Sequence, residues 1–381
     1  MKTHLITLAL VALTFSSKLC ADEFTHPPIN PALLYWQTAA LLPKLTDDQA
    51  KNLRAMAAGS MPFDAAKAKE VLPDERIQHL LQKAANSTAP CDWGMPTEDG
   101  PDMALPHTAK IMEMASMAIL EAEASFADGK TRDGMDWLIV AHRMARHAGA
   151  GDLLITNLVQ ISIETNVLRA AARHCLNWDE QTRQAYAAML EALPPLHTMQ
   201  SAYRGEQILT DWVEHKFQVG GKAEIEKLMQ EVAGGAGNAM KPEDKAALAA
   251  NLEPAAFQAG LAEWRSLQRR TEAALGKPWP EAQPELQKLD DEIKHSSYYL
   301  VRDAAPTAIG IGEKQYVIAT MHTMLAAVLK HGSQLDESTA ADYHDSFAGE
   351  SLRVQKNDGT LTLSMAREYR AKKIVSLQFG K

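Results

Sequence analysis

The chain of 381 residues is 46% hydrophobic and carries a formal net charge of −9 at pH 7. This acidic balance argues against a basic surface for nucleic acid or anionic lipid. Most of the apolar content is Ala, Leu and Met, which are strong helix formers, so we expect a mostly α-helical protein of one large or two medium domains.

Residues 1–21 have the layout of a secretory signal peptide. A charged start precedes an apolar run from Leu5 to Phe15, and small residues follow it. This run of 11 residues is shorter than the ~20 needed to span a bilayer. We therefore expect cleavage after Ala21, no transmembrane span in the mature chain, and a periplasmic or secreted location. Lipid attachment at Cys20 is a second interpretation, which the charge of Lys18 disfavours.

Two cysteines, Cys91 and Cys175, remain after that cleavage. In an oxidising compartment such a pair predicts one disulfide. Closing the long loop between them would stabilise the fold by up to roughly 4.5 kcal/mol in the chain-entropy treatment. Two buried free thiols are the alternative, because cysteine is often buried without being bonded.

Helix boundaries are legible in the first part of the chain. Asn30 is placed as an N-cap, with Pro31 at the first helical position. Thr46 and Gln49 have the spacing of a capping box, and Gly59 marks the end of that helix. These signals predict two short helices before the acidic segment that follows.

Long helical hairpins follow. The pair from His107 to Gly149 has the alanine and small-residue placement of a tetratricopeptide-like hairpin, and the pair from Gly151 to Leu193 has a similar length. We expect stacked antiparallel hairpins, as a bundle or a short α-solenoid, in a helical domain over residues 22–231.

The remainder divides into three parts. Glycines crowd residues 232–244, which we predict to be a loop or hinge. Residues 245–340 form a second helical region. In residues 341–381 a pattern alternates around Asn357-Asp358-Gly359, which predicts a small β-hairpin at the carboxyl end.

The segment from Val317 to Met365 resembles the carboxyl end of a broad group of uncharacterised bacterial exported helical proteins. In that group a helix precedes a "DPF-G-PL…DG" turn and hairpin, which is similar to the pseudopilin carboxyl end. Six positions match: Asp345, Phe347, Gly349, Leu352, Asp358 and Gly359. Ser346 and Ser351 replace the two prolines, and Val354 replaces an aromatic residue. The resemblance implies an exported helical body and carries over no activity. We expect no cofactor; calcium is the alternative, because the corresponding turn of pseudopilins can hold it.

The strongest candidate site is the acidic segment Cys91 to His107, "CDWGMPTEDGPDMALPH", which contains no Lys or Arg. Oxygen-rich loops can bind calcium, which makes Asp92, Asp99 and Asp102 candidate metal ligands. Glu98, Asp99 and His107 are candidate catalytic residues, because crowding raises the pKa of a carboxyl group. The favoured interpretation is a structural connection, since the spacing is not that of an EF-hand and turn residues dominate.

Two helical clusters complete the candidates. Asp211 and His215 are four residues apart and share a helix face, which suits a metal ion or an oriented base but also an ordinary side-chain pair. His142, Arg143, Arg146 and His147 form a basic patch that could receive the acidic segment or an anionic ligand. Their position near a helix end also explains them, because cations there oppose the helix dipole.

Standard catalytic signatures are missing from the sequence: there is no His-Glu-x-x-His, Gly-x-Ser-x-Gly, phosphate loop or Cys-x-x-Cys. Our first hypothesis is a non-catalytic scaffold or binding protein that holds a protein or peptide partner against its stacked helices. The alternative is an extracytoplasmic hydrolase that uses the acidic loop 92–107. The sequence leaves enzymatic activity undecided.

Overall fold

The computed structural model describes residues 28–235, 249–369 and 373–380. The expected signal peptide and most of the expected hinge at 232–244 lie outside these ranges. Within them the prediction of a mostly helical fold with a small carboxyl-terminal sheet is confirmed. None of the described helices is both long enough and apolar enough to cross a membrane.

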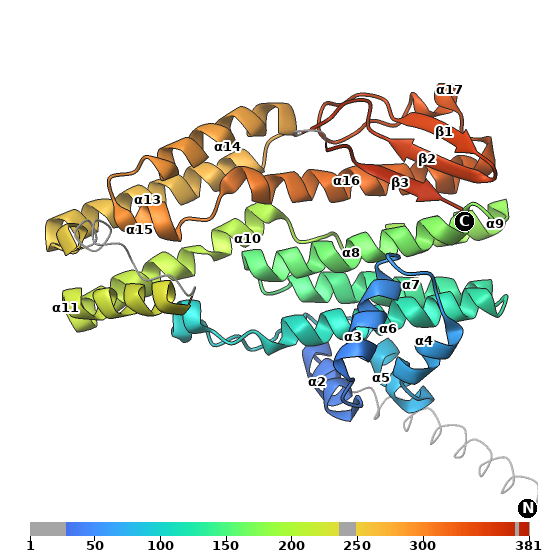
Figure 1. The fold of residues 1–381 in the computed structure, drawn as a ribbon, viewed down its shortest axis with the longest axis horizontal. Coiled ribbons are helices and arrows are strands. Elements are labelled where there is room, and N and C mark those ends of the chain that lie inside the picture. The colour runs from blue at the N-terminus through green and yellow to red at the C-terminus, as the bar shows by residue number, and fades with distance from the viewer. Residues whose placement is uncertain (1–27, 236–248, 370–372, 381) are drawn as a thin grey trace, which may run out of the picture.

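Three long antiparallel helices form the centre of the molecule (Figure 1): α6 (Pro106–Ala127), α7 (Thr131–Gly149) and α8 (Leu154–Cys175). Four shorter helices pack against α6 and α7: α2 (Pro31–Leu41), α3 (Asp47–Ala57), α4 (Ala65–Val71) and α5 (Glu75–Ala85). The first two begin where the sequence predicts, because Asn30 caps α2 and Thr46 forms the expected capping box with Gln49 at the start of α3.

The second half of the chain returns along the other side of α8 (Figure 1). α9 (Glu180–Glu191), α10 (Met199–Gly205) and α11 (Gln207–Gly235) lead to an upper layer. That layer contains α13 (Pro254–Leu275), α14 (Trp279–Lys294), α15 (Tyr299–Ala304), α16 (Ala308–His331) and the short α17 (Glu337–Ala340). α16 packs on both α8 and α9.

One large apolar core joins residues from Leu34 to Phe379, so it crosses the boundaries expected near 231 and 340. A smaller apolar cluster lies where α11, α13 and α15 meet, and it includes Phe257 and Leu261. The core residues of α6, α7 and α8 include many alanines, which let these helices approach closely.

The carboxyl-terminal sheet contains the expected hairpin and one further strand. β1 (Arg353–Asn357) pairs antiparallel with β2 (Thr360–Ser364), and β2 pairs with β3 (Ser376–Phe379). Asp358 and Gly359, with φ of 33° and 82°, make the turn between β1 and β2. The sequence did not predict β3, whose buried Leu377 and Phe379 pack toward α8 and α16.

The expected Cys91–Cys175 disulfide is wrong, because both cysteines are free. Cys91 lies beside His147 near the end of α7, whereas Cys175 is the last residue of α8. Since α7 and α8 run antiparallel, the 22 residues of α8 separate the two thiols by roughly 30 Å. No backbone adjustment short of unfolding would bring them within bonding distance.

Gly205, the last residue of α10, is a sensitive point of helix packing. A Cβ atom at Gly205 would lie 1.8 Å from the backbone oxygen of Asp152. We therefore expect Gly205→Ala to reduce the free energy of unfolding by about 3 kcal/mol, because backbone cannot move aside as a side chain can.

Urea denaturation measures this loss. Gly310→Ala within α16 is the matched control, because its Cβ would meet only Thr307 Oγ1 at 3.6 Å. The control should be neutral or slightly stabilising. Equal stability of the two variants would contradict the packing described.

Candidate functional site

The acidic segment is a connection held in place by two tryptophans. The indole N–H of Trp93 donates to the backbone oxygen of His147 at 2.8 Å, and its ring stacks on His107 with centroids 4.7 Å apart. The indole N–H of Trp212, on α11, donates to the backbone oxygen of Glu98 at 3.0 Å. Gly100 lies directly on the Trp212 ring, where any Cβ would come within 2.4 Å of ring atoms. The segment therefore bridges α7 and α11.

The structure does not bring the candidate catalytic residues together. Glu98 and Asp99 are exposed on the 3-10 turn η1 (Thr97–Asp102), whereas His107 is only 3% exposed beneath Trp93. Burial lowers the pKa of His107 to about 4, and its Nε2 has no hydrogen-bond partner. His107 is thus a neutral ring in the core at neutral pH.

The candidate metal ligands are also separated. Asp92 accepts a hydrogen bond from its neighbour Gly94, and the side chain of Asp102 is not described. Asp211 accepts from Arg265 at 2.7 Å rather than facing His215, which is exposed. In the described ranges there is no group of three or more His, Cys, Asp or Glu side chains that could hold a metal ion.

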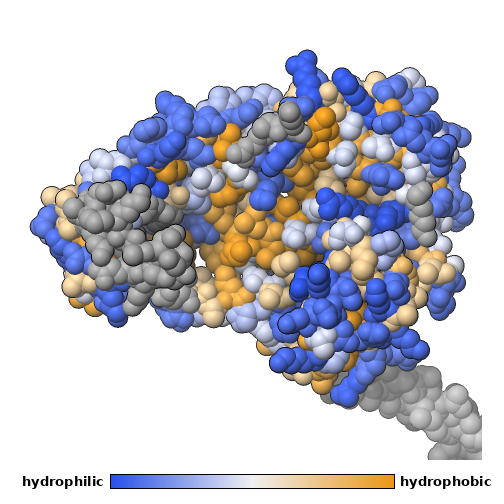
Figure 2. All heavy atoms as spheres, viewed as in Figure 1, coloured by the Kyte–Doolittle hydropathy of each residue, from blue (hydrophilic) through white to orange (hydrophobic). Residues whose placement is uncertain are grey.

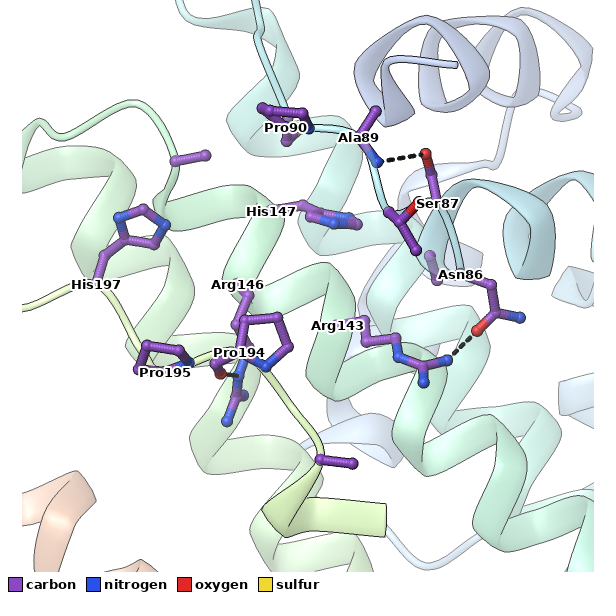
Figure 3. Close-up of a pocket in the computed structure, with 15 residues that line it drawn as sticks. Asn86, Ser87, Ala89, Pro90, Arg143, Arg146, His147, Pro194, Pro195 and His197 are labelled. Atoms are coloured by element: carbon purple, nitrogen blue, oxygen red, sulfur yellow. Dashed lines mark hydrogen bonds between the residues drawn. The ribbon is translucent and has the colours of Figure 1, made fainter. Parts of the chain in front are cut away.

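The basic patch on α7 divides into two sets with different surroundings. His142 and Arg146 turn inward to Glu164 of α8, which is fully buried. Arg143 and His147 face a cleft at the end of α7 (Figure 3). Arg146 takes part in both, because it also lines the cleft.

Glu164 is the centre of a buried polar network. His142 Nδ1 lies 2.9 Å from Glu164 Oε1, and His142 Nε2 lies 3.1 Å from the Tyr186 hydroxyl. Arg146 Nη1 donates to Glu164 Oε2, and His322 of α16 places Nε2 2.9 Å from Oε1 without hydrogen-bond alignment. The network therefore connects α7, α8, α9 and α16.

The protonation states in this network follow from burial and charge. Burial alone would raise the pKa of Glu164, but His142, His322 and Arg146 hold it well below its usual range. Burial lowers the pKa of His142, against the opposing pull of Glu164, and burial raises the pKa of Tyr186. A neutral His142 can then donate from Nδ1 to the carboxylate and accept at Nε2 from the Tyr186 hydroxyl.

The cleft beside this network has a volume of about 600 Å³ and is named here the anion cleft. Its walls are the loop Ala85–Cys91, the end of α7, and the residues between α9 and α10. Four cationic or imidazole side chains line it, and no Asp or Glu does: Arg143, Arg146, His147 and His197 (Figure 3).

Hydrogen bonds with neighbouring residues position three of these four residues. Arg143 donates to the side-chain oxygen of Asn86, and Arg146 Nε donates to the backbone oxygen of Pro194 at 3.2 Å. Two amides of α8 hold the His197 segment: Asn157 and Gln160 donate to the backbone oxygen of His197 at 2.7 and 2.8 Å.

His147 can act in the anion cleft as a neutral donor. Burial, with a smaller contribution from the charge of Arg143, lowers its pKa to about 4. The buried Tyr35 hydroxyl lies 2.9 Å from His147 Nδ1, and burial raises the pKa of Tyr35. A proton donated by Tyr35 to Nδ1 leaves the imidazole proton on Nε2.

The anion cleft is better equipped for binding than for catalysis. Burial raises the pKa of the Cys91 thiol to about 12, so it stays protonated and unreactive at neutral pH. The hydroxyl of Ser87 donates to the backbone oxygen of Ile29 at 2.6 Å. Positive charge and N–H donors without a lining carboxylate are the chemistry of an anion site.

The sequence predicts one half of this cleft. The basic patch on α7 is visible in it, whereas no local pattern places Pro194, Pro195 and His197 on the opposite wall. The sequence offers one signal for Glu164. Its neighbours Ile163 and Val167 are apolar, and an acidic side chain on such a helix face is expected to need a buried partner.

Acidification should destabilise the fold through its neutral buried histidines. Unfolded histidine takes a proton near pH 6.5, whereas His107 and His147 do so at about 4, so between these values the unfolded state binds more protons. Stability is then lost as the pH falls through this window. His107→Phe keeps the ring stack and should lower the slope of unfolding free energy by roughly 1 kcal/mol per pH unit.

Chemical denaturation at a series of pH values measures these slopes. His79→Gln is the control, because His79 is exposed. Parallel slopes for the wild type and His107→Phe would show that His107 titrates normally.

Removal of the Glu164 carboxylate should be severe. Glu164→Leu leaves the buried guanidinium of Arg146 without its counter-charge, and we expect a loss of about 3–5 kcal/mol. Thermal and urea unfolding at about pH 7 measure the loss, with the exposed Glu191→Leu as control. A loss below about 1 kcal/mol for Glu164→Leu would contradict its role as the counter-charge.

Comparisons of this chain with protein-family models, with curated proteins and with solved structures found no match.

Proposed function

We propose that this protein is an exported, non-catalytic helical binding protein that holds an anionic ligand in the anion cleft. The observation that carries the proposal is the convergence of Arg143, Arg146, His147 and His197 on a cleft with no lining carboxylate. The signal-peptide layout of residues 1–21 supports export.

Charge within the anion cleft is distributed unevenly. Arg146 is paired with Glu164, and His197 Nδ1 lies 3.2 Å from Asp152 Oδ1. Among the described residues, the hydrogen-bond partner of the Arg143 side chain is the neutral amide of Asn86. Arg143 therefore carries the uncompensated positive charge, and we assign to it the main contact with the ligand.

The ligand class follows from these donors. Guanidinium groups bind carboxylate and phosphate oxygens through paired hydrogen bonds, and the imidazole Nε2–H of His147 adds a neutral donor. Prolines at positions 90, 194 and 195 give the cleft stiff walls, which lowers the entropy lost on binding. A volume of about 600 Å³ suits a small molecule or the end of a peptide.

The hydrolase alternative gains no support from the geometry. Glu98 and Asp99 are exposed, whereas His107 is buried under Trp93, so the three side chains do not share one surface. The acidic loop is explained by its contacts with Trp93 and Trp212. Binding at the anion cleft remains the function that the arrangement supports best.

Titration calorimetry on the mature chain tests this proposal. The probes are inorganic phosphate, N-acetyl-dialanine with a free carboxylate, and the same dipeptide as its carboxamide. We expect the carboxylate or the phosphate to bind and the carboxamide not to bind. Arg143→Gln should weaken that binding 10- to 100-fold, because one charge-assisted hydrogen bond contributes about 1.5–3 kcal/mol.

Arg132→Gln is the matched control, since Arg132 is an exposed arginine of the same helix that pairs with Asp136. The control should bind like the wild type. Phosphate and carboxylate arms separate the two ligand chemistries. Equal binding by wild type and Arg143→Gln, or no binding of either anion, would reject the proposal.

A further inference from the structure

One side of α8 is partly exposed in the part of the chain that the structure describes. Its partly or fully exposed residues recur at helical spacing along a single stripe: Ile155, Leu158, Ile161, Ser162, Thr165, Asn166 and Arg169. Residues between them, such as Ile163 and Val167, are buried in the core. The stripe changes from apolar at the start of α8 to polar and basic toward its end.

α16 supplies the opposite wall of a groove. Gly310, Lys314 and Val317 face α8 at one-turn spacing, and the pocket between the two helices has a volume of about 590 Å³. The space-filling view shows a hollow with apolar side chains gathered between α16 and α8, near the middle of this face (Figure 2). We name it the α8–α16 groove.

Apolar side chains form part of the floor of this groove. Leu158, Ile161 and Val317 line it and are half-buried, and Ile155, one turn before Leu158 on α8, is 46% exposed. Contiguous apolar surface bordered by polar residues is typical of protein interaction sites.

The rim of the groove is basic, although the chain as a whole carries a net charge of −9. Arg169, Lys314 and Lys373 line the pocket, and none of their side chains forms a hydrogen bond or ion pair with another described residue. The one acid in the lining, Glu313, is buried. Local charge therefore favours an acidic partner.

We propose that the α8–α16 groove binds an acidic amphipathic helix of a protein partner. The apolar face of that helix lies on Leu158, Ile161 and Val317, and its flanking carboxylates meet Arg169, Lys314 and Lys373. This inference uses a surface separate from the anion cleft and does not depend on it.

Dimensions agree with this occupant. The stripe from Ile155 to Arg169 is about 21 Å long, which is the length of about four helical turns. A helix laid between α8 and α16 would present apolar residues at i, i+3 or i+4, and i+7 to the floor. Acidic residues of the partner on either side of its apolar face then lie within reach of Arg169, Lys314 and Lys373. Their attraction to these cations also raises the association rate.

The test uses the mature chain and a synthetic peptide of about 14 residues, with leucines on one helical face and glutamates on the others. A scrambled peptide of identical composition is the peptide control. Fluorescence anisotropy should show binding of the amphipathic peptide only, and that binding should weaken as salt is raised.

Two variants test the basic rim and the apolar floor separately. Arg169→Glu combined with Lys314→Glu should weaken peptide binding at least tenfold, and Ile155→Asn, which removes apolar surface without adding charge, should weaken it without changing its salt dependence. Lys330→Glu, an exposed position elsewhere on α16, is the matched control. All these positions are exposed, so we expect each variant to fold, and circular dichroism checks this.

A lysine version of the peptide supplies a rescue. The doubly reversed variant should bind it better than the wild type does, which a purely structural effect of the substitutions cannot produce.

Several results would overturn the proposal. One is equal binding of the amphipathic and scrambled peptides, and another is unchanged binding by the reversed variant. Concentration-dependent dimers that Ile155→Asn abolishes would assign the groove to a second copy of this chain. Binding of phosphatidylglycerol vesicles without peptide binding would assign it to a lipid surface.

Discussion

The ion pair between Glu164 and Arg146, completed by His142, is the interaction on which the helical packing depends. Removing a carboxylate from water carries a penalty of several kcal/mol, which only well-placed partners offset. Here the partners come from α7, α9 and α16, with the Tyr186 hydroxyl bonded to the far side of His142. Apolar helices can slide and still bury surface, whereas this network is satisfied in one relative position only.

That fixed position also shapes the two surfaces proposed for binding. Arg146 lies between Glu164 and the anion cleft, so the counter-charge that neutralises it also holds one wall of the cleft. The same α8 that carries Glu164 inward presents Leu158 and Ile161 outward to the groove. α8 therefore lines the groove directly and supports the anion cleft through Glu164, which keeps residues of both surfaces in place before any ligand arrives.

Local signals in the sequence were sufficient for local structure. Asn30, Thr46 and the Asp358–Gly359 turn predicted their elements because capping and turn formation depend on neighbouring residues. The disulfide was wrong and β3 was missed because both depend on where distant segments meet. The candidate site shows the same division: the patch on α7 is visible in sequence, whereas its opposite wall at Pro194 and His197 comes from a segment that only the fold brings near.

The backbone N–H of Gly380 donates to the oxygen of Ala172, and β3 rests on α8. The central helix is thus completed by residues made some two hundred positions later. During synthesis, part of the surface of α8 stays uncovered until β3 has been made. Contacts this distant in sequence slow folding. The partly folded chain is therefore exposed to proteases and to aggregation for longer than its helical content suggests.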